Sequence, residues 1–323
     1  MGETPGVRTQ IESGKNVQRN RTSDASSRVY GGKVIFSQLS GDIMRFAICN
    51  ETFQDRSLED GLALAAECGY EGIEIAPFTL AERVTDLSPQ RRTEIRQAIE
   101  KAGLETVGLH WLLAKTEGFH LTSPEETVRQ RTAEYLCELA RCCADLGGTI
   151  LVFGSPQQRN VLPHVTRAKA EDYAVEVFEK LIPELERTNT ILALEPLGIQ
   201  ETNFVNTAEE AVTIINKLGS PRVRLHLDCK AMCSEATPIP ILLRMFREYL
   251  VHFHANDPNR LGPGFGELDF VPIFEALLEI GYQGWVSVEV FDYTPGPERI
   301  ARDSLQYMRR CLEQARQVRA GQV

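Results

Sequence analysis

Long apolar runs are the first feature that this sequence of 323 residues lacks. No stretch approaches the roughly 18–20 consecutive apolar residues that a membrane-spanning helix needs, so we expect no membrane partner. A basic surplus is also absent, because 35 Lys and Arg stand against 45 Asp and Glu, for a formal net charge of −10. Proteins that bind nucleic acids usually carry a basic footprint, so we expect no nucleic-acid partner.

A paired cysteine motif is missing as well. The eight cysteines include no C-x-x-C pair, which excludes the spacing of zinc ribbons and of thioredoxin-like redox sites. Several stand in apolar segments, such as Cys49 in RFAIC and Cys68 in ALAAEC, where a reduced thiol acts as a small hydrophobic side chain. The start of the chain also lacks the basic and apolar regions of a secretory signal. We therefore expect a reducing, cytoplasmic setting.

The first 43 residues differ in composition from the remainder. The stretch MGETPGVRTQIESGKNVQRNRTSDASS is polar and has neither a helical nor a strand period. Such composition is typical of segments that cannot bury enough surface to become ordered. We expect residues 1–43 to form a disordered N-terminal extension and residues 44–318 to form a single domain.

From Met44 onward, short apolar runs alternate with longer amphipathic ones. The short runs are apolar on both faces, as parallel strands covered by helices must be. The predicted strands are residues 45–49, 72–76, 106–111, 149–153, 191–196, 223–228, 250–254 and 286–291. Apolar residues at three- and four-residue spacing predict helices over residues 57–68, 89–102, 124–146, 167–187, 207–218, 240–249, 271–280 and 297–318. This alternation predicts an α/β fold, a closed (β/α)8 TIM barrel, with an open doubly wound sheet as the alternative.

Ionisable residues end several predicted strands, which is where the active site of such a barrel lies. The last four strands each carry one metal-capable side chain near the C-terminal end: Glu195, Asp228, His254 and Glu289. A carboxylate in an apolar strand is costly unless it is paired, hydrogen-bonded or bound to a metal. Three carboxylates and one imidazole suit oxygen-seeking divalent ions better than thiolate-seeking ones. We therefore predict a metal site, with Mn²⁺ as the expected ion and Mg²⁺, Co²⁺ or Zn²⁺ as alternatives.

The segments around these four residues carry a family resemblance. LALEPL, HLDCKAM, HFHANDPNR and SVEVF, with spacings of 33, 26 and 35 residues between the four side chains, resemble the xylose isomerase-like TIM barrel superfamily. The resemblance is to its branch of sugar-phosphate isomerases/epimerases and ketose 3-epimerases, and it covers residues 44–315. It implies a metal-dependent enzyme that isomerises or epimerises a keto sugar or a sugar derivative.

The resemblance also implies roles for individual residues. Glu195 and Glu289 match residues that bind the metal and act as the catalytic acid–base pair. Physical reasoning agrees, because carboxylates on opposite faces of a sugar can remove a proton beside a carbonyl and return one. Glu201 and Arg260 match positions that contact the substrate. Glu74 ends the second predicted strand, where the superfamily often keeps an acid near the metal.

Other residues near the predicted site need separate interpretation. Ala231 stands where ketose 3-epimerases usually have a histidine, which argues against a free ketohexose as substrate, and we expect Lys230 at a helix start facing water. His110 and Trp111 end the third strand and are candidates for substrate binding, as a sugar-stacking wall or a proton relay. Two further histidines share the inward parity and are expected to be hydrogen-bonded in the core: His226 and His252.

Three other functions stay open at this point. A metal-dependent lyase, either a keto-inositol dehydratase or an enzyme that cleaves an oxidised glycoside, would use the same proton abstraction. The superfamily also contains apurinic-site endonucleases, but Ala231 and Phe270-Val271 stand where their extra zinc ligands are expected, and the acidic balance disfavours a nuclease. A binding module without activity is the third. We expect a small carbohydrate as substrate, no dinucleotide cofactor because no strand–GxGxxG–helix pattern is present, and a homo-oligomer as an open option.

Overall fold

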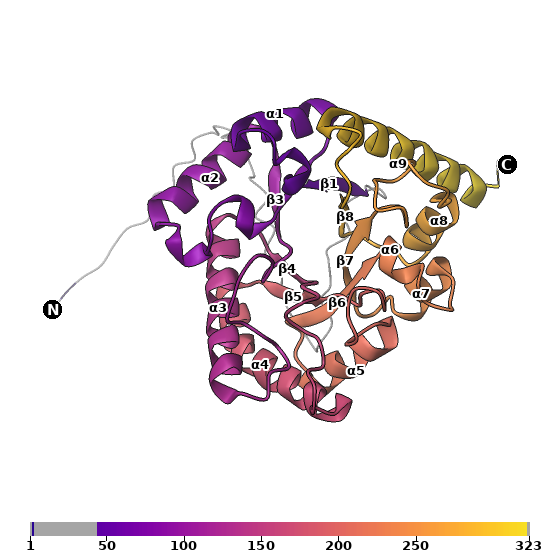
Figure 1. Cartoon of the computed structure of the whole chain (residues 1–323). Helices are drawn as coiled ribbons and strands as arrows, with labels where there is room; N and C mark the ends of the chain where they lie inside the picture. The colour runs from indigo at the N-terminus through magenta and orange to yellow at the C-terminus, as the bar shows by residue number, and fades with distance from the viewer. Residues whose placement is uncertain (1, 3–43, 322–323) are drawn as a thin grey trace. The chain divides into compact units, whose positions relative to one another are not determined.

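The computed structural model describes residue 2 and residues 44–321, so the predicted disorder of residues 1–43 lies outside the described residues, apart from residue 2. The strands pair in parallel and in chain order, and the last pairs with the first, which closes a barrel (Figure 1). They are β1 (Arg45–Cys49), β2 (Gly72–Ile75), β3 (Glu105–Leu109), β4 (Ile150–Phe153), β5 (Ile191–Leu194), β6 (Val223–Asp228), β7 (Leu250–Ala255) and β8 (Trp285–Val288). The predicted TIM barrel is confirmed, and the doubly wound sheet is wrong.

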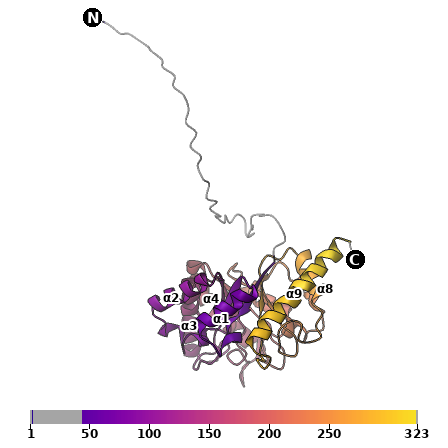
Figure 2. The same cartoon turned by 90° about the horizontal axis from the view of Figure 1, so that it is seen from above.

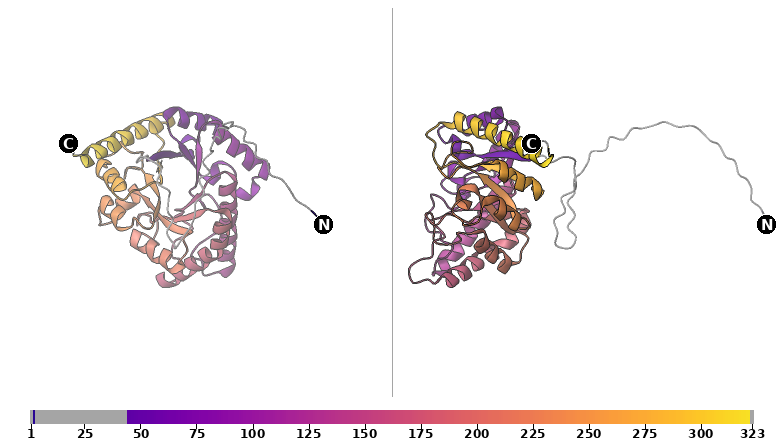
Figure 3. Two further views of the ribbon diagram at one scale, coloured as in Figure 1. Left: turned by 180° about the vertical axis from the view of Figure 1, so that it is seen from behind. Right: turned by 90° about the vertical axis from the view of Figure 1, so that its right-hand side faces the viewer.

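Helices surround the strands (Figures 1 and 3). The α-helices are α1 (Leu58–Cys68), α2 (Pro89–Lys101), α3 (Glu126–Asp145), α4 (Arg167–Thr188), α5 (Ala208–Leu218), α6 (Cys229–Met232), α7 (Ile239–Met245), α8 (Val271–Glu279) and α9 (Pro297–Arg319). Short 3₁₀ helices follow the first two strands: η1 (Asn50–Phe53), η2 (Pro77–Thr79) and η3 (Val84–Asp86). Helices α1 and α9 pack together beside the β1–β8 seam (Figure 2). Within residues 44–321, no helix combines the length and apolarity needed to span a membrane.

The sequence marks the ends of several helices by capping. Ser57, Ser88 and Thr207 each accept a hydrogen bond from the backbone N–H three residues further on. Each bond satisfies a donor that has no partner inside the helix. Gly69 (φ 98°) and Gly219 (φ 59°) end α1 and α5 in the left-handed conformation, which glycine adopts without a steric penalty. The chain therefore leaves each helix directly toward the next strand.

The barrel has an apolar outer layer and a polar interior. Phe153 of β4 packs against Phe178 of α4, with ring centroids 5.3 Å apart. The β3 and β4 backbones approach so closely that a Cβ on Gly108 would lie 1.9 Å from the Ile150 carbonyl oxygen. Inside the barrel, by contrast, the fully buried side chains include several polar ones: Glu74, His226, His252, His254 and Ser287. The ionisable side chains therefore lie inside the barrel, and the helices cover the apolar outer face of the strands.

The segment between β6 and β7 differs most from the prediction. The helix predicted over residues 240–249 is wrong at its end, because α7 ends at Met245 and the chain makes tighter turns before β7. In these turns the N–H of Tyr249 bonds the carbonyl of Phe246. Helix α6 was not among the predicted ranges, because four residues are too few to show a helical period, but Lys230 does lie at a helix start as expected. It begins directly after Asp228, whose Oδ1 caps it by accepting the N–H of Ala231 at 2.7 Å.

Candidate active site

The four predicted metal ligands meet at the C-terminal mouth of the barrel. Asp228 ends β6 and His254 lies in β7, while Glu195 and Glu289 directly follow β5 and β8. One ligand atom from each lies within 4.8 Å of the others. All four residues are buried, with at most 5% of each exposed. The structure therefore brings together the residues that the sequence placed on consecutive strands, and we refer to them as the quartet.

Neighbouring groups hold three members of the quartet in place. Asp228 accepts hydrogen bonds from the N–H of Ala231 at 2.7 Å and from Nδ2 of Asn256 at 2.5 Å. The Nδ1 atom of His254 lies 3.1 Å from Oε2 of Glu289. Its other nitrogen, Nε2, lies 3.1 Å from Oε1 of Glu74. The imidazole is thus held from behind, with Nδ1 directed at the quartet.

The two glutamates of the quartet have opposite pKa shifts. Burial, together with repulsion from Glu289 and Asp228, raises the pKa of Glu195 well above its usual range. Burial alone would also raise the pKa of Glu289, but the charge and hydrogen bond of His254 outweigh it and lower that pKa. Burial raises the pKa of Asp228 to about 6. The two glutamates therefore favour different protonation states, which is the property that an acid–base pair needs.

The same observations test whether a divalent cation suits the quartet. Repulsion among the three carboxylates helps to keep Glu195 protonated, and a cation between them would remove that repulsion. A histidine whose second nitrogen faces a carboxylate is the usual arrangement of an imidazole ligand, and His254 has it through Glu74. Three oxygen donors and one nitrogen donor suit Mn²⁺ or Mg²⁺. The residues present therefore fit the predicted metal.

Aromatic side chains border the quartet. Trp111 has a left-handed backbone (φ 52°), and its Nε1 donates to Oε1 of Glu289 at 2.5 Å. Its ring stacks on Phe291, with centroids 5.9 Å apart and planes inclined by 28°. Phe78 contacts the same indole, also at 5.9 Å. This arrangement gives an apolar surface of the kind on which sugar rings stack, and it places a hydrogen-bond donor on one quartet carboxylate.

The other residues predicted to contact the substrate lie in three different environments: an ion pair, the exposed rim and the buried interior. Glu201 pairs with Lys230, with Nζ and Oε2 2.7 Å apart. The expectation that Lys230 faces water is therefore wrong: 14% of its side chain is exposed, and its Nζ lies 4.7 Å from the centre of the Phe291 ring. Arg260 is exposed and lies at the rim, where it donates to the carbonyl of Phe291 at 3.4 Å. His110 is fully buried, with Nε2 2.9 Å from a carboxylate oxygen of Glu51.

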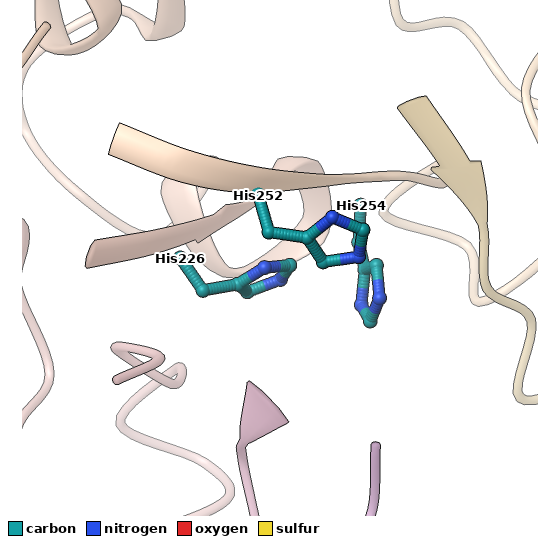
Figure 4. A group of neighbouring side chains, drawn as sticks. All are labelled: His226, His252 and His254. Carbon is teal, nitrogen blue, oxygen red and sulfur yellow. The ribbon is translucent and has the colours of Figure 1, made fainter. Parts of the chain in front are cut away.

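Of the two deeper histidines that were expected to be hydrogen-bonded, one is and one is not. The rings of His226, His252 and His254 gather beside β6 and β7 (Figure 4), with centroids 4.2 to 5.2 Å apart. His252 is hydrogen-bonded as expected, because its Nε2 lies 2.8 Å from Glu74. The expectation of a hydrogen-bonded His226 is wrong, since neither ring nitrogen has such a partner among the described residues. Burial and the neighbouring imidazoles lower the pKa of His226, so this ring is neutral.

Two buried residues of the site were not found from the sequence. Arg159, in the β4–α4 loop, is fully buried and donates to the backbone carbonyls of Glu195, at 2.6 Å, and of Phe153. Burial lowers the pKa of this guanidinium to about 10. Glu51, in η1, is 1% exposed. Both lie in short segments between regular elements, where the sequence shows no hydrophobic period from which burial could be predicted. For Glu51 one signal existed: the strand-like run ends at Cys49, so the residues that follow it lie at the barrel mouth.

Comparison with known proteins identifies a family and relatives of known activity. The sequence profile of the xylose isomerase-like TIM barrel matches residues 62–311. D-psicose 3-epimerase from Enterocloster bolteae is 35% identical over 118 residues, which span 36% of this chain and 39% of that relative. The 3-dehydro-D-guloside 4-epimerase of Escherichia coli is 26% identical over 274 residues, which span 83% of this chain and 100% of that relative.

Solved structures show the same fold. D-psicose 3-epimerase from Clostridium cellulolyticum, crystallised with D-tagatose, superposes with a TM-score of 0.74. The alignment covers 83% of this chain and 99% of that chain at 22% sequence identity. At this level of identity the likeness concerns the barrel architecture.

Proposed function

The chain belongs to the xylose isomerase-like TIM barrel family, and on that basis we propose that it is a divalent-metal-dependent sugar epimerase or isomerase. The observation that carries the proposal is the convergence of four buried ligand atoms within 4.8 Å at the barrel mouth. The relatives support an enzyme of the isomerase class, since those named above are sugar epimerases. We take Mn²⁺ as the ion, because oxygen donors dominate the quartet.

The proposed reaction moves a proton at the carbon next to a sugar carbonyl. When bound, the divalent cation polarises the carbonyl and stabilises the negative charge that develops as this proton leaves. Glu289, whose pKa is lowered, removes the proton, and Glu195, whose pKa is raised, returns one from the opposite side. Trp111 holds Glu289 through its indole N–H. The epimer results when the proton returns to the other face of the same carbon.

The substrate class follows from the groups around the quartet. Stacked aromatic rings favour a sugar ring or chain, and the Lys230–Glu201 pair offers a donor and an acceptor to hydroxyl groups. Ala231 offers no side-chain donor where the ketose 3-epimerases usually have a histidine. We therefore propose a keto sugar or sugar derivative rather than a free ketohexose. The eight cysteines are unpaired, which supports the proposed reducing, cytoplasmic setting.

Solvent exchange tests this proposal directly. Protein loaded with Mn²⁺ is incubated in D₂O with a panel of keto sugars, keto glycosides and sugar acids, and deuterium next to the carbonyl is followed by NMR and mass spectrometry. We expect deuterated epimer with at least one substrate. Glu195→Gln and Glu289→Gln should abolish this incorporation, whereas Glu179→Gln, on the exposed side of α4, should leave it unchanged. A metal-loaded protein that exchanges no substrate contradicts the proposal, and loss of water or of an aglycone would assign a lyase instead.

A further inference from the structure

A second group of metal-capable side chains lies beside the quartet and has no role in the proposed reaction. It consists of Cys49 at the end of β1, Glu51 in η1 and His110 directly after β3, and we call it the inner triad. One ligand atom from each residue lies within 4.8 Å of the other two. The three residues are 0%, 1% and 0% exposed. They come from separate elements, so the barrel itself brings a thiol, a carboxylate and an imidazole to one point.

The polar atoms of the inner triad lack the partners that burial demands. Among the described residues, no hydrogen-bond partner reaches either carboxylate oxygen of Glu51 or either ring nitrogen of His110. Nε2 of His110 and Oε2 of Glu51 face each other at 2.9 Å, which makes an ion pair when the imidazole is protonated. A buried polar group without a partner costs about 1–3 kcal/mol, and more when charged. Oε1 of Glu51 and Nδ1 of His110 then remain without a hydrogen-bond partner beside the Cys49 thiol, which indicates a missing ligand.

We propose that the inner triad binds a Zn²⁺ ion, separate from the cation of the quartet. Thiolate, imidazole and carboxylate are the three donor types that zinc takes in proteins, and three protein ligands leave the fourth tetrahedral position to water. As the sulfur–zinc bond forms, the thiol of Cys49 releases its proton to solvent. The oxygen-rich quartet has no sulfur donor and suits a harder ion. The barrel then carries two cations of different chemistry.

The contacts of neighbouring residues place the zinc at the inner triad and nowhere else in this cluster. Cys49 also lies within ligand distance of Glu74 and His254. Those two side chains are engaged with each other, at 3.1 Å, and Glu74 also bonds His252. Glu51 and His110 face each other, at 2.9 Å, and form no hydrogen bond with the quartet among the described residues. The ion would connect the end of β1, η1 and the residue after β3. This place lies next to the quartet, since the ring centroids of His110 and the quartet residue His254 are 5.9 Å apart.

The rival arrangement is a metal-free ion pair between Glu51 and a protonated His110. It uses the same two atoms 2.9 Å apart, and the Cys49 thiol then keeps its hydrogen-bond contact with Oγ of Ser287, at 3.7 Å. Metal content distinguishes the two directly. Zinc binds a given nitrogen and oxygen site more tightly than manganese does at equal concentration. Chelator-stripped protein is therefore dialysed against a large excess of Mn²⁺ with one equivalent of Zn²⁺ per chain, and bound metal is measured by mass spectrometry. We expect one Zn²⁺ and one Mn²⁺ per chain.

Single variants then locate each ion. Cys49→Ala should lose the zinc and keep the manganese, whereas Glu289→Gln should weaken manganese binding and keep the zinc. Cys143→Ala, which alters another fully buried thiol, bonded to the carbonyl of Ile150, is the matched control and should keep both. Failure of the quartet to bind a metal would thus be seen separately from failure of the inner triad.

Cobalt gives a spectroscopic readout that needs no activity. Co²⁺-loaded protein should show a near-ultraviolet thiolate-to-cobalt band that Cys49→Ser removes and Cys143→Ala retains. Glu51→Gln should lower zinc affinity at least tenfold while leaving manganese binding unchanged. A protein that binds no zinc at stoichiometric concentration, or whose zinc and cobalt band survive Cys49→Ser, overturns the proposal and leaves the ion pair as the arrangement.

Discussion

At the residue scale, the hydrogen bond between Trp111 and Glu289 joins the aromatic surface to the proposed base. The indole N–H donates at 2.5 Å to a carboxylate whose pKa, although raised by burial, is lowered overall by His254 and by this bond. A hydrogen bond to a charged group contributes about 1.5–3 kcal/mol. In the proposed reaction, Trp111 would therefore act on the base as well as offer its ring to the substrate.

Replacing this tryptophan tests the role of its N–H. We expect Trp111→Phe, which keeps an aromatic ring, to lower kcat/KM roughly 10- to 100-fold, because about 1.4 kcal/mol corresponds to a factor of ten. The pKa of Glu289 should rise without its donor, so the acidic limb of the pH–rate profile should move to higher pH. The other tryptophan supplies the control: Trp285 begins β8, where it packs under Arg45 at 3.8 Å, and Trp285→Phe should leave the profile in place. An unshifted profile in Trp111→Phe would contradict this role.

A glycine beside the quartet leads to a second prediction. A Cβ on Gly154 would lie 1.7 Å from Oε2 of Glu195, so this carboxylate must move when any side chain is added. We expect Gly154→Ala to fold, because the clash is with the end of a side chain, but to bind Mn²⁺ at least tenfold more weakly by calorimetry. Adding Glu195→Asp should recover part of the affinity by shortening the displaced side chain. The control is Gly198→Ala, whose Cβ would meet the side-chain ends of Gln200 at 3.0 Å and Glu201 at 3.3 Å, with no quartet atom among its three nearest. Equal affinities of the two single variants would show that Glu195 is free to move.

Single residues also show which features of the site could be predicted from the sequence and which could not. The quartet was predictable because each member ends an apolar strand, and a charge in such a position needs a reason. Lys230 and Arg159 were not, because their environment is created by chain segments far away in sequence. Lys230 is covered through Glu201 and Phe291. Arg159 is buried because its guanidinium reaches the carbonyl of Glu195, 36 residues on.

At the element scale, strand positions were predictable and short helices were not. RFAIC is largely apolar and VRLHLD alternates apolar with polar residues, which are both strand patterns, and β1 and β6 match their predicted bounds. The end of α7 at Met245 depends on turns that begin at Phe246, where the sequence still carries apolar residues at helical spacing. Helix α6 depends on the capping carboxylate of Asp228. The hydrophobic period of the sequence thus determines where long helices and strands lie, while contacts between distant segments determine the short segments between them.

The packing of α3 against α4 gives a pH prediction. Burial alone would raise the pKa of Glu184, but hydrogen bonds from Arg187 and Arg141 lower it below its usual 4.5. A lowered pKa means that the folded state holds the charged form, so this stability is present above pH 4.5 and is lost as the pH falls through the lowered value. We expect Glu184→Gln to reduce the free energy of unfolding by about 0.5–1 kcal/mol at pH 7, with the difference vanishing in acid. Urea unfolding at several pH values measures it, and Glu186→Gln, an exposed neighbour, should change little.

At the scale of the whole molecule, the barrel buries several carboxylates at its centre and mouth. Buried carboxylates enter from β2, η1 and the ends of β5, β6 and β8, in a space that most proteins fill with apolar side chains. Burying them costs free energy unless cations or donors compensate. The helices and outer strand faces supply the apolar packing that sustains this cost. We therefore expect the proposed cation to stabilise the mouth, where most of these carboxylates lie.

Metal removal should reveal this cost. A cation that binds only the folded barrel adds about 2.7 kcal/mol of stability at one hundred times its Kd. For a domain of this size each kcal/mol corresponds to a shift of about 2–4 °C in Tm, so we expect a chelator to lower Tm by roughly 5–10 °C. The variant Glu195→Gln distinguishes the stabilisation that the cation supplies from the cost of burying the carboxylates. Burial and the neighbouring carboxylates raise the pKa of Glu195 and so favour its neutral form. The neutral glutamine should therefore change the Tm of the stripped protein little, yet most of the increase with Mn²⁺ should be lost. A native protein whose Tm ignores the chelator, measured by calorimetry with the metal content verified, would show that the carboxylates are compensated by the protein alone.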